Sequence, residues 1–309
     1  KGESILVFGT NVSGKIQLGN TLQDFKVAQT LFIRIFAKID IESNATILTF
    51  NVEPGPIVRG TGLLYVNIKQ GINAPIYLKD ANFTVRVFID GEWKVVGNGR
   101  IITEGKLEQS SGLLTLSAIV NLNRAGFSYF GENLISKGII TIMFSDIQMK
   151  VEIFDLKGIL PFKDMKVDFK GPSISVSIDN IYDVQYRIVI ESIVPPRFRI
   201  TDASVKVDIT ISNPFNFTIS MKNISFDVYA EGGVYLGKGG VGYEVILGPK
   251  ESKTIKGITV QITNTGYLVG KYDVRSDCIS GFSAYAKGTG IATVYDVSFK
   301  ASFVTSNSR

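Results

Sequence analysis

The stretch VKVDITISNPFNFTISMKN, residues 205–223, carries the pattern that decides the fold. Apolar residues take every second position from Val205 to Ile211 and again from Phe217 to Met221. This period of two is typical of a β-strand with one buried face. The polar pair Lys222-Asn223 then reverses the parity, which predicts a bulge or bend, because a one-residue slip would otherwise expose the buried face.

Asn213-Pro214 interrupts this alternation at the point where one strand should end. Proline donates no backbone hydrogen bond and biases the residue before it toward extended or turn geometry. The pair therefore predicts a corner of the sheet, with the Asn213 side chain capping the turned backbone. On this basis we expect a structural role for Asn213 and Pro214.

Short strands of the same kind recur along the chain, and glycine-rich turns separate them. The clearest further strands are 63–68, 83–88, 150–154, 258–262 and 294–303. The predicted turns are Asp90-Gly91, Gly97-Asn98-Gly99, Glu231-Gly232-Gly233, Gly237-Lys238-Gly239-Gly240 and Gly248-Pro249. A helical period of 3.6 is found only in a short piece at 265–274. The pattern predicts an all-β protein made of antiparallel β-sandwiches of the immunoglobulin or fibronectin type III kind.

An internal repeat divides the chain into two similar halves. A shift of 141 residues (223 − 82) places Asn82-Phe83-Thr84 on Asn223-Ile224-Ser225, so one glycosylation sequon falls on another. With one deletion, Gly97 then meets Gly237. We therefore predict two tandem sandwiches, the first at 25–160 and the second at 161–309.

Residues 1–24 precede the best-matching part of the repeat and contain the apolar run ILVF at 5–8. One interpretation is an edge strand that closes the first domain. The other is an arm that pairs with the exposed sheet edge of a neighbouring subunit. The sequence leaves both interpretations open.

The composition argues against several classes of protein. The net charge is +5, and lysine and arginine are scattered rather than clustered, so we expect no nucleic-acid binding, although weak attraction to an acidic membrane surface is compatible with this charge. The chain has no histidine, which removes the commonest general base and metal ligand. Cys278 therefore has no histidine to activate it, and we expect a small buried apolar residue.

These features predict a protein without enzymatic activity, catalytic residues or cofactor. The acidic pairs Asp179 with Asp183 and Asp273 with Asp277 consist of the oxygen ligands that calcium prefers. Neither pair has the ligand density of a dedicated calcium loop, so we expect solvated turn residues and no metal site.

Sequons of the form Asn-x-Ser/Thr predict glycosylation acceptors in an extracellular protein. The candidate acceptors are Asn11, Asn44, Asn82, Asn216 and Asn223. Parity places Asn82 and Asn216 on the polar faces of their strands, where a glycan would project into solvent. Together with the low charged fraction of 20%, the sequons favour a location outside the cell or at its surface, and we expect a signal peptide or anchor to have preceded Lys1.

Four stretches of the second half follow one another in a familiar order. They are VKVDITISNPFNF (205–217), ISFDVYAEGGVYLGKGGVGYEV (224–245), LGPKESKTIKGITVQI (247–262) and FSAYAKGTGIATVYDVSFKASF (282–303). The Asn-Pro-x-Asn at 213–216, the glycine turn and the proline-containing loop resemble the late embryogenesis abundant type 2 family, also called the water stress and hypersensitive response domain. The match covers about 198–303, and the first half resembles the family only through the repeat, with Asn73-Ala74-Pro75 in place of Asn-Pro.

That resemblance implies a sandwich of seven or eight strands and a non-enzymatic role, either in desiccation protection or at membranes and surfaces. Tandem copies of this kind resemble archaeal members of the family.

Three hypotheses on function remain. The leading one is a glycosylated structural protein of the cell surface that self-associates through sheet edges, with residues 1–24 joining subunits into a filament by strand exchange. The second is a stress-protective protein that shields membranes or other proteins during dehydration. The third is a module that binds lipid or another apolar ligand in the gap between the sheets.

Overall fold

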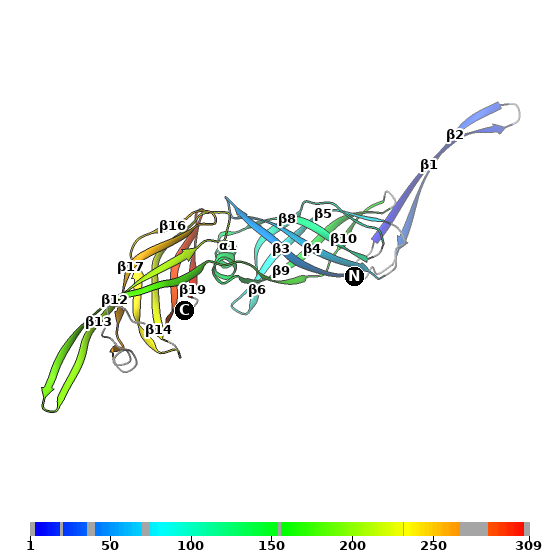
Figure 1. Ribbon diagram of the computed structural model, residues 1–309. Helices are drawn as coiled ribbons and strands as arrows, with labels where there is room; N and C mark the ends of the chain where they lie inside the picture. The colour runs from blue at the N-terminus through cyan, green and yellow to red at the C-terminus, as the bar shows by residue number, and fades with distance from the viewer. Residues whose placement is uncertain are drawn as a thin grey trace.

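The computed structural model describes residues 4–18, 21–35, 41–69, 75–109, 111–153, 156–230, 232–265 and 284–305. Strands dominate, and two antiparallel sheets form two sandwich-like bodies that lie one after the other along an elongated molecule (Figure 1). The predicted all-β architecture with two tandem sandwiches is therefore confirmed.

Nine strands form the first sheet: β3 (Ile41–Glu53), β4 (Ile57–Ile68), β5 (Ile76–Ile89), β6 (Glu92–Ile101), β7 (Gly105–Leu107), β8 (Ser111–Leu122), β9 (Ile139–Ile153), β10 (Leu156–Pro161) and β11 (Met165–Lys170). Their order is β10-β9-β5-β6-β8-β4-β3, with β11 also paired to β9 and β7 to β5. The sheet folds over on itself, so that the edge strand β3 lies beside β11.

Eight strands form the second sheet: β12 (Ser175–Ile193), β13 (Pro196–Ser212), β14 (Ile219–Ala230), β15 (Tyr235–Val241), β16 (Val245–Leu247), β17 (Ser252–Ile262), β18 (Ala284–Val294) and β19 (Val297–Val304). Their order is β12-β13-β17-β15-β14-β18-β19, with β16 paired to β14. When the second sheet is followed from β19 to β12, its strand order is the same as that of the first sheet, with β19 in the place of β10 and β11. The internal repeat is therefore present in the topology.

The strand ladders also fix which residues of the two sheets correspond. Gly97 pairs with Leu122 between β6 and β8, and Gly237 pairs with Ile262 between β15 and β17. These pairs stand at the same place in the two sheets and differ by 140 residues (237 − 97 and 262 − 122), as the shift with one deletion predicted.

Strands β5 and β14 correspond through a different shift. Phe83 pairs with Gly99, and Phe226 pairs with Gly239. A Cβ atom on either glycine would meet the paired ring, at 2.1 Å in the first body and 2.8 Å in the second. Phe83 therefore corresponds to Phe226, a shift of 143 residues (226 − 83), and the expected superposition of one sequon on another is wrong.

Two of the glycine-rich stretches expected as turns lie inside strands instead. Gly97-Asn98-Gly99 belongs to β6, and Gly237-Lys238-Gly239-Gly240 belongs to β15. Glycine is needed there because neighbouring groups come very close: a Cβ atom on Gly237 would lie 2.0 Å from the carbonyl oxygen of Gln261. Asp90-Gly91 does form a hairpin turn, with φ of 54° and 83°, as primed turns require.

The bulge predicted from the parity reversal is confirmed. The register between β14 and β18 shifts between Lys222 and Ser225, and Asn223 has a φ of 52°. Asparagine tolerates this left-handed conformation better than most residues with a side chain. Met221 before the bulge and Ile224 after it are both buried, so the strand keeps one apolar face across the change of parity.

A helical segment that the sequence analysis missed lies between β8 and β9. α1 (Arg124–Phe130) continues into the π-helical turn η1 (Gly131–Ile135). Asn123 caps the segment, because its side-chain oxygen accepts a hydrogen bond from the Gly126 N–H at 2.7 Å. The helical piece expected at 265–274 lies outside the described residues beyond Thr265.

The helical segment joins the two bodies. The ring of Phe299 in β19 packs so closely on Gly131 that a Cβ atom there would lie 2.4 Å away. The Ser136 hydroxyl donates to the Ser302 carbonyl at 2.8 Å and accepts from the Ser302 N–H at 2.7 Å. One buried apolar cluster includes Phe130 of the first body together with Phe299 of the second. The bodies therefore share part of their core.

The ends of the two bodies differ from the expected boundaries. Because β11 pairs with β9, the first sheet continues to Lys170, beyond the boundary expected between 160 and 161. At the N-terminus, β1 (Ser4–Leu18) and β2 (Thr21–Ile35) form a two-stranded antiparallel sheet of their own. Within the described residues neither strand pairs with the nine-stranded sheet, so the hairpin does not act as its edge strand.

Candidate functional sites: two projecting hairpins and an apolar cavity

Two long hairpins project from opposite ends of the molecule (Figure 1). At one end, β1 and β2 pair along 15 residues each. At the other end, β13 pairs with β17 only from Ala203 onward, so residues 186–202 of β12 and β13 extend beyond the sheet as a two-stranded ribbon. We refer to residues 186–202 as the β12–β13 ribbon.

The β12–β13 ribbon carries exposed apolar side chains. Tyr186, Ile188 and Ile190 occupy alternate positions and therefore share one face, with 44%, 52% and 62% of each residue exposed. At the tip, Ile193 and Val194 are 81% and 87% exposed. Exposed apolar side chains that gather on one segment mark interaction sites more often than singly scattered ones do.

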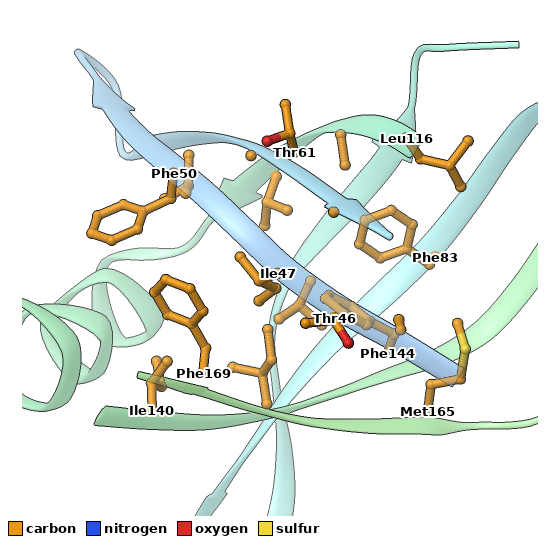
Figure 2. Close-up of a pocket in the computed structure, with 18 of the residues that line it drawn as sticks. Thr46, Ile47, Phe50, Thr61, Phe83, Leu116, Ile140, Phe144, Met165 and Phe169 are labelled. Carbon is orange, nitrogen blue, oxygen red and sulfur yellow. The ribbon is translucent and has the colours of Figure 1, made fainter. Parts of the chain in front are cut away.

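An apolar cavity of about 160 Å³ lies inside the first body. Figure 2 shows Ile47 and Phe50 of β3, Phe144 of β9 and Phe169 of β11 around this space. The rings of Phe50 and Phe169 meet edge to face, with centroids 5.8 Å apart, where β3 lies beside β11. The lining comes from seven strands and the helical segment, and the cavity therefore occupies the space between the layers of the sandwich.

The cavity arises from small residues at paired positions. Gly60 of β4 pairs with Ala118 of β8. The corresponding pair in the second body is Val207 with Ile258. Each of these two residue pairs stands two positions along its strands from a pair of valines, and the strand ladders already show that the two valine pairs correspond. Val207 and Ile258 are 1% and 7% exposed and fill the second core, whereas glycine and alanine leave space in the first.

The next positions along the strands repeat this difference. Gly62 of β4 corresponds to Ile209 of β13, and Ala45 of β3 corresponds to Val176 of β12. Both Ile209 and Val176 are buried. The sequence analysis missed the cavity because its signal, small residues on facing strands, appears only once the pairing is known.

The Asn213-Pro214 corner is built around the buried Asn213 side chain. The amide group of Asn213 donates to the carbonyl oxygens of Phe217 and Gly248, each at 2.8 Å. Its oxygen accepts from the Phe215 N–H at 3.0 Å. The side chain thus joins the corner to the end of β16. The related Asn73-Ala74 in the first half lies outside the described residues.

The sequon asparagines with described side chains are exposed. They are Asn44, Asn82, Asn216 and Asn223. Asn82 lies on the outer face of β5, as parity predicted, whereas Asn216 lies in the corner before β14 rather than within a strand. Asn11 belongs to β1, whose side chains lie outside the described part of the structure.

The described acidic pair, Asp179 with Asp183, is not brought together as a ligand set. Asp179 accepts hydrogen bonds from Ser177 and from Thr210, at 2.8 and 2.5 Å. Asp183 forms an ion pair with Lys206 at 2.5 Å, and the hydrogen bond from Lys206 lowers the pKa of that carboxyl. Within the described residues, no group of three or more histidine, cysteine or acidic side chains is arranged to hold a metal ion. Cys278 and the pair Asp273 with Asp277 lie outside the described residues.

Asp208 is a buried acidic group, and it links three strands. It accepts from the Gly257 N–H at 2.8 Å, from Tyr182 at 3.0 Å and from Asn180 at 3.2 Å. Burial opposes ionisation of Asp208, but the hydrogen bonds from Gly257, Asn180 and Tyr182 together outweigh it, and the pKa of the carboxyl is lowered. These contacts satisfy the bulged backbone of β17 and give Asp208 a structural role.

None of the helices in the described part of the chain is long and apolar enough to span a membrane.

Comparison with known proteins finds no matching family model and no matching curated protein. Among solved structures, a red sea bream transglutaminase is 8% identical with a TM-score of 0.34, over 89% of this chain and 32% of its own. A Bacteroides uniformis β-glucuronidase is 11% identical with a TM-score of 0.21, over 81% and 26%. A Mobiluncus mulieris adhesin is 9% identical with a TM-score of 0.19, over 87% and 99%.

The chain thus spans a third or less of the length of the first two structures. All three similarities are too low to carry an argument about activity, substrate or partner.

Proposed function

We propose that the protein is a non-enzymatic structural subunit of the cell surface that joins copies of itself head to tail through its projecting hairpins. The observation that supports this proposal is the pair of two-stranded hairpins at opposite ends of an elongated molecule (Figure 1). The sheet edges of these hairpins are unpaired within the described residues, and such edges are templates for pairing with another chain.

Stability considerations favour an interaction partner for both hairpins. An isolated two-stranded hairpin is at best marginally stable in water, because it cannot bury enough apolar surface on either face. The exposed residues Ile188, Ile190, Ile193 and Val194 would lose contact with water if the β12–β13 ribbon docked on another chain.

A second copy of this chain is the proposed partner. The hairpins lie at opposite ends, so a contact between unlike ends is heterologous and leaves a free end on each subunit. Such a contact continues into an open chain or filament rather than closing into a dimer.

The test compares the assembly of three variants with that of the full chain. Deletion of residues 1–35 removes β1 and β2, and the double substitution Ile188→Ser with Ile190→Ser makes the ribbon face polar. The control is Leu113→Ser, which removes another apolar side chain that is 62% exposed, on β8. Light scattering after size exclusion and negative-stain electron microscopy measure assembly, while circular dichroism and Trp93 fluorescence establish folding.

We expect folded monomers from the deletion and from the double substitution, and unchanged assembly from Leu113→Ser. The proposal is wrong if the full chain stays monomeric, or if assembly persists without residues 1–35.

We further propose an extracellular location with N-linked glycans on exposed sequons. The exposed positions of Asn44, Asn82, Asn216 and Asn223 support this proposal. The intact mass of protein from its native source should exceed the sequence mass by whole glycan units. Asn82→Gln should remove one such unit if that site is occupied, and an unmodified native mass would contradict the proposal.

A further inference from the structure

The cavity in the first body is encoded at specific positions rather than left by loose packing. The two sheets have the same strand order, yet glycine and alanine at 45, 60, 62 and 118 stand where the second sheet has valine and isoleucine. Those four positions together lack about a dozen side-chain carbons relative to their counterparts, a change that costs stability in an ordinary core. All four line the cavity.

The shape of the cavity favours a long, thin ligand. Its lining runs along β4 from Val58 to Leu64 and along β8 from Leu116 to Leu122. Six residue steps of a strand cover about 20 Å at roughly 3.3 Å per residue. The volume of about 160 Å³ is similar to that of a dry protein cavity of ~150 Å³ that holds one benzene ring. Spread over the length of the strands, the same volume gives a narrow slot.

The chemistry of the lining excludes a buried charge. No charged side chain contributes to it, and its only side-chain hydroxyls are those of Thr46 and Thr61. The Thr61 hydroxyl is already hydrogen-bonded to Thr49 at 2.5 Å. A carboxylate or ammonium group would lose its hydration without gaining a partner of opposite charge, which is costly.

The inward-facing residues also remain within reach of solvent. Ile47, Val120 and Phe144 line the cavity and are only partly buried, although alternation directs them into the first body. Val260, the residue of the second body that corresponds to Val120, is 0% exposed. When an apolar ligand covers an apolar surface that water reaches in the empty protein, the change in free energy is favourable.

We propose that the first body binds an uncharged, unbranched alkyl chain in this cavity. The site is separate from the hairpins, so it goes beyond the proposed assembly function, and neither proposal depends on the other.

The test measures binding of n-hexanol to the purified full chain by isothermal titration calorimetry. Methyl-group NMR of isoleucine and valine side chains locates the bound probe. Ala118→Ile introduces the residue found at the matched position of the second body, and Ala45→Val is a second cavity-filling variant. The matched control is Thr115→Ile, which adds a similar apolar side chain on the exposed face of the same strand. Gly62 is left unchanged, because a Cβ atom there would lie 2.7 Å from the Thr46 carbonyl oxygen.

We expect saturable binding of one hexanol molecule, with methyl shifts at Ile142 and Val120. Each cavity-filling variant should weaken binding by about tenfold or more, a difference of ~1.4 kcal/mol, whereas Thr115→Ile should bind as the wild type does. Hexanoate at neutral pH should bind more weakly than hexanol, because its carboxylate finds no cationic partner in the lining.

Three results would overturn the proposal. They are the absence of saturable binding, undiminished binding in both folded cavity-filling variants, and loss of binding in the Ile188→Ser, Ile190→Ser variant, which would place the probe on the ribbon. None of these results alters the assembly test.

Discussion

Replacement of Asn213 by alanine should destabilise the second body far more than replacement of its neighbour Asn216. The Asn213 side chain is 2% exposed and makes close hydrogen bonds to the backbone of Phe215, Phe217 and Gly248. A buried hydrogen bond contributes about 1 kcal/mol net, and a buried group left without a partner costs about 1–3 kcal/mol. We therefore expect a loss of roughly 3–4 kcal/mol for Asn213→Ala.

The control shares the same corner. Asn216 is exposed, and an exposed substitution away from such contacts usually changes stability by less than about 0.5 kcal/mol. Urea unfolding followed by far-ultraviolet circular dichroism measures the difference. With a urea m-value of about 3 kcal/mol/M, the midpoint should fall by roughly 1 M for Asn213→Ala and hardly at all for Asn216→Ala.

The chain's single tryptophan, Trp93 on β6, reports separately on the first body. Its transition should shift less than the dichroism signal, because the lost hydrogen bonds belong to the second sheet. If Asn213→Ala lies within about 0.5 kcal/mol of Asn216→Ala, the structural role of the corner is refuted.

Asn213→Asp extends this test to pH. A buried carboxylate facing two carbonyl oxygens has its pKa raised, because burial and the missing donors both disfavour the charged form. The protonated form can still donate one hydrogen bond. Stability of this variant should therefore be greatest below the unfolded pKa of about 3.9 and should decrease as the pH rises through the folded value. A variant insensitive to pH would contradict this account.

Three further predictions follow from the packing. Asp208 has a lowered pKa, so its contribution to stability is present above the unfolded pKa of ~3.9 and is lost as the pH falls toward the folded pKa. Asp208→Asn should therefore lower the urea midpoint at pH ~7, and the difference in midpoint from the wild type should narrow near pH ~3. Gly131→Ala should lower the free energy of unfolding by about 1–3 kcal/mol because the added Cβ displaces Phe299, and limited proteolysis should then cut the chain at 171–174. Gly242→Ala is the control: its Cβ meets open space, so it should change neither stability nor proteolysis. Ile178→Ala should cost about 2–5 kcal/mol in the filled second core, and the matched Ile47→Ala, beside the cavity, should cost clearly less in the same urea assay; equal losses would contradict the packing difference.

The sequence was sufficient for features that depend on neighbouring residues. Alternation from Val205 to Ile211 predicted the buried face of β13, and the polar pair at 222–223 predicted the bulge that the register of β14 and β18 confirms. Both signals arise from the two-residue period of a strand and need no knowledge of its partner.

Features that depend on distant partners could not be predicted in this way. Glycine at 97, 99, 237 and 239 has the same local appearance in a turn as in a strand, and its role is decided by a phenylalanine ring or a backbone oxygen from another strand. The helical segment is too short for a clear period, although Phe127, Phe130 and Leu134 at spacings of three and four, after a capping asparagine, were a usable signal. The cavity needed the pairing of Gly60 with Ala118, which only the sheet supplies.

The passage between the two bodies has a mechanical consequence. Gly171 donates its N–H to the Gly138 carbonyl at 2.8 Å, and Ile174 donates to the Ile135 carbonyl at 3.0 Å, so residues 171–174 are held against the end of η1 and the residues that follow it instead of forming a free linker. A tensile force applied at the two hairpins would therefore pass through a packed junction that contains no loose segment of chain to extend first. The molecule should extend little before that junction ruptures, and it should transmit tension as a stiff rod rather than as two domains joined by a flexible linker.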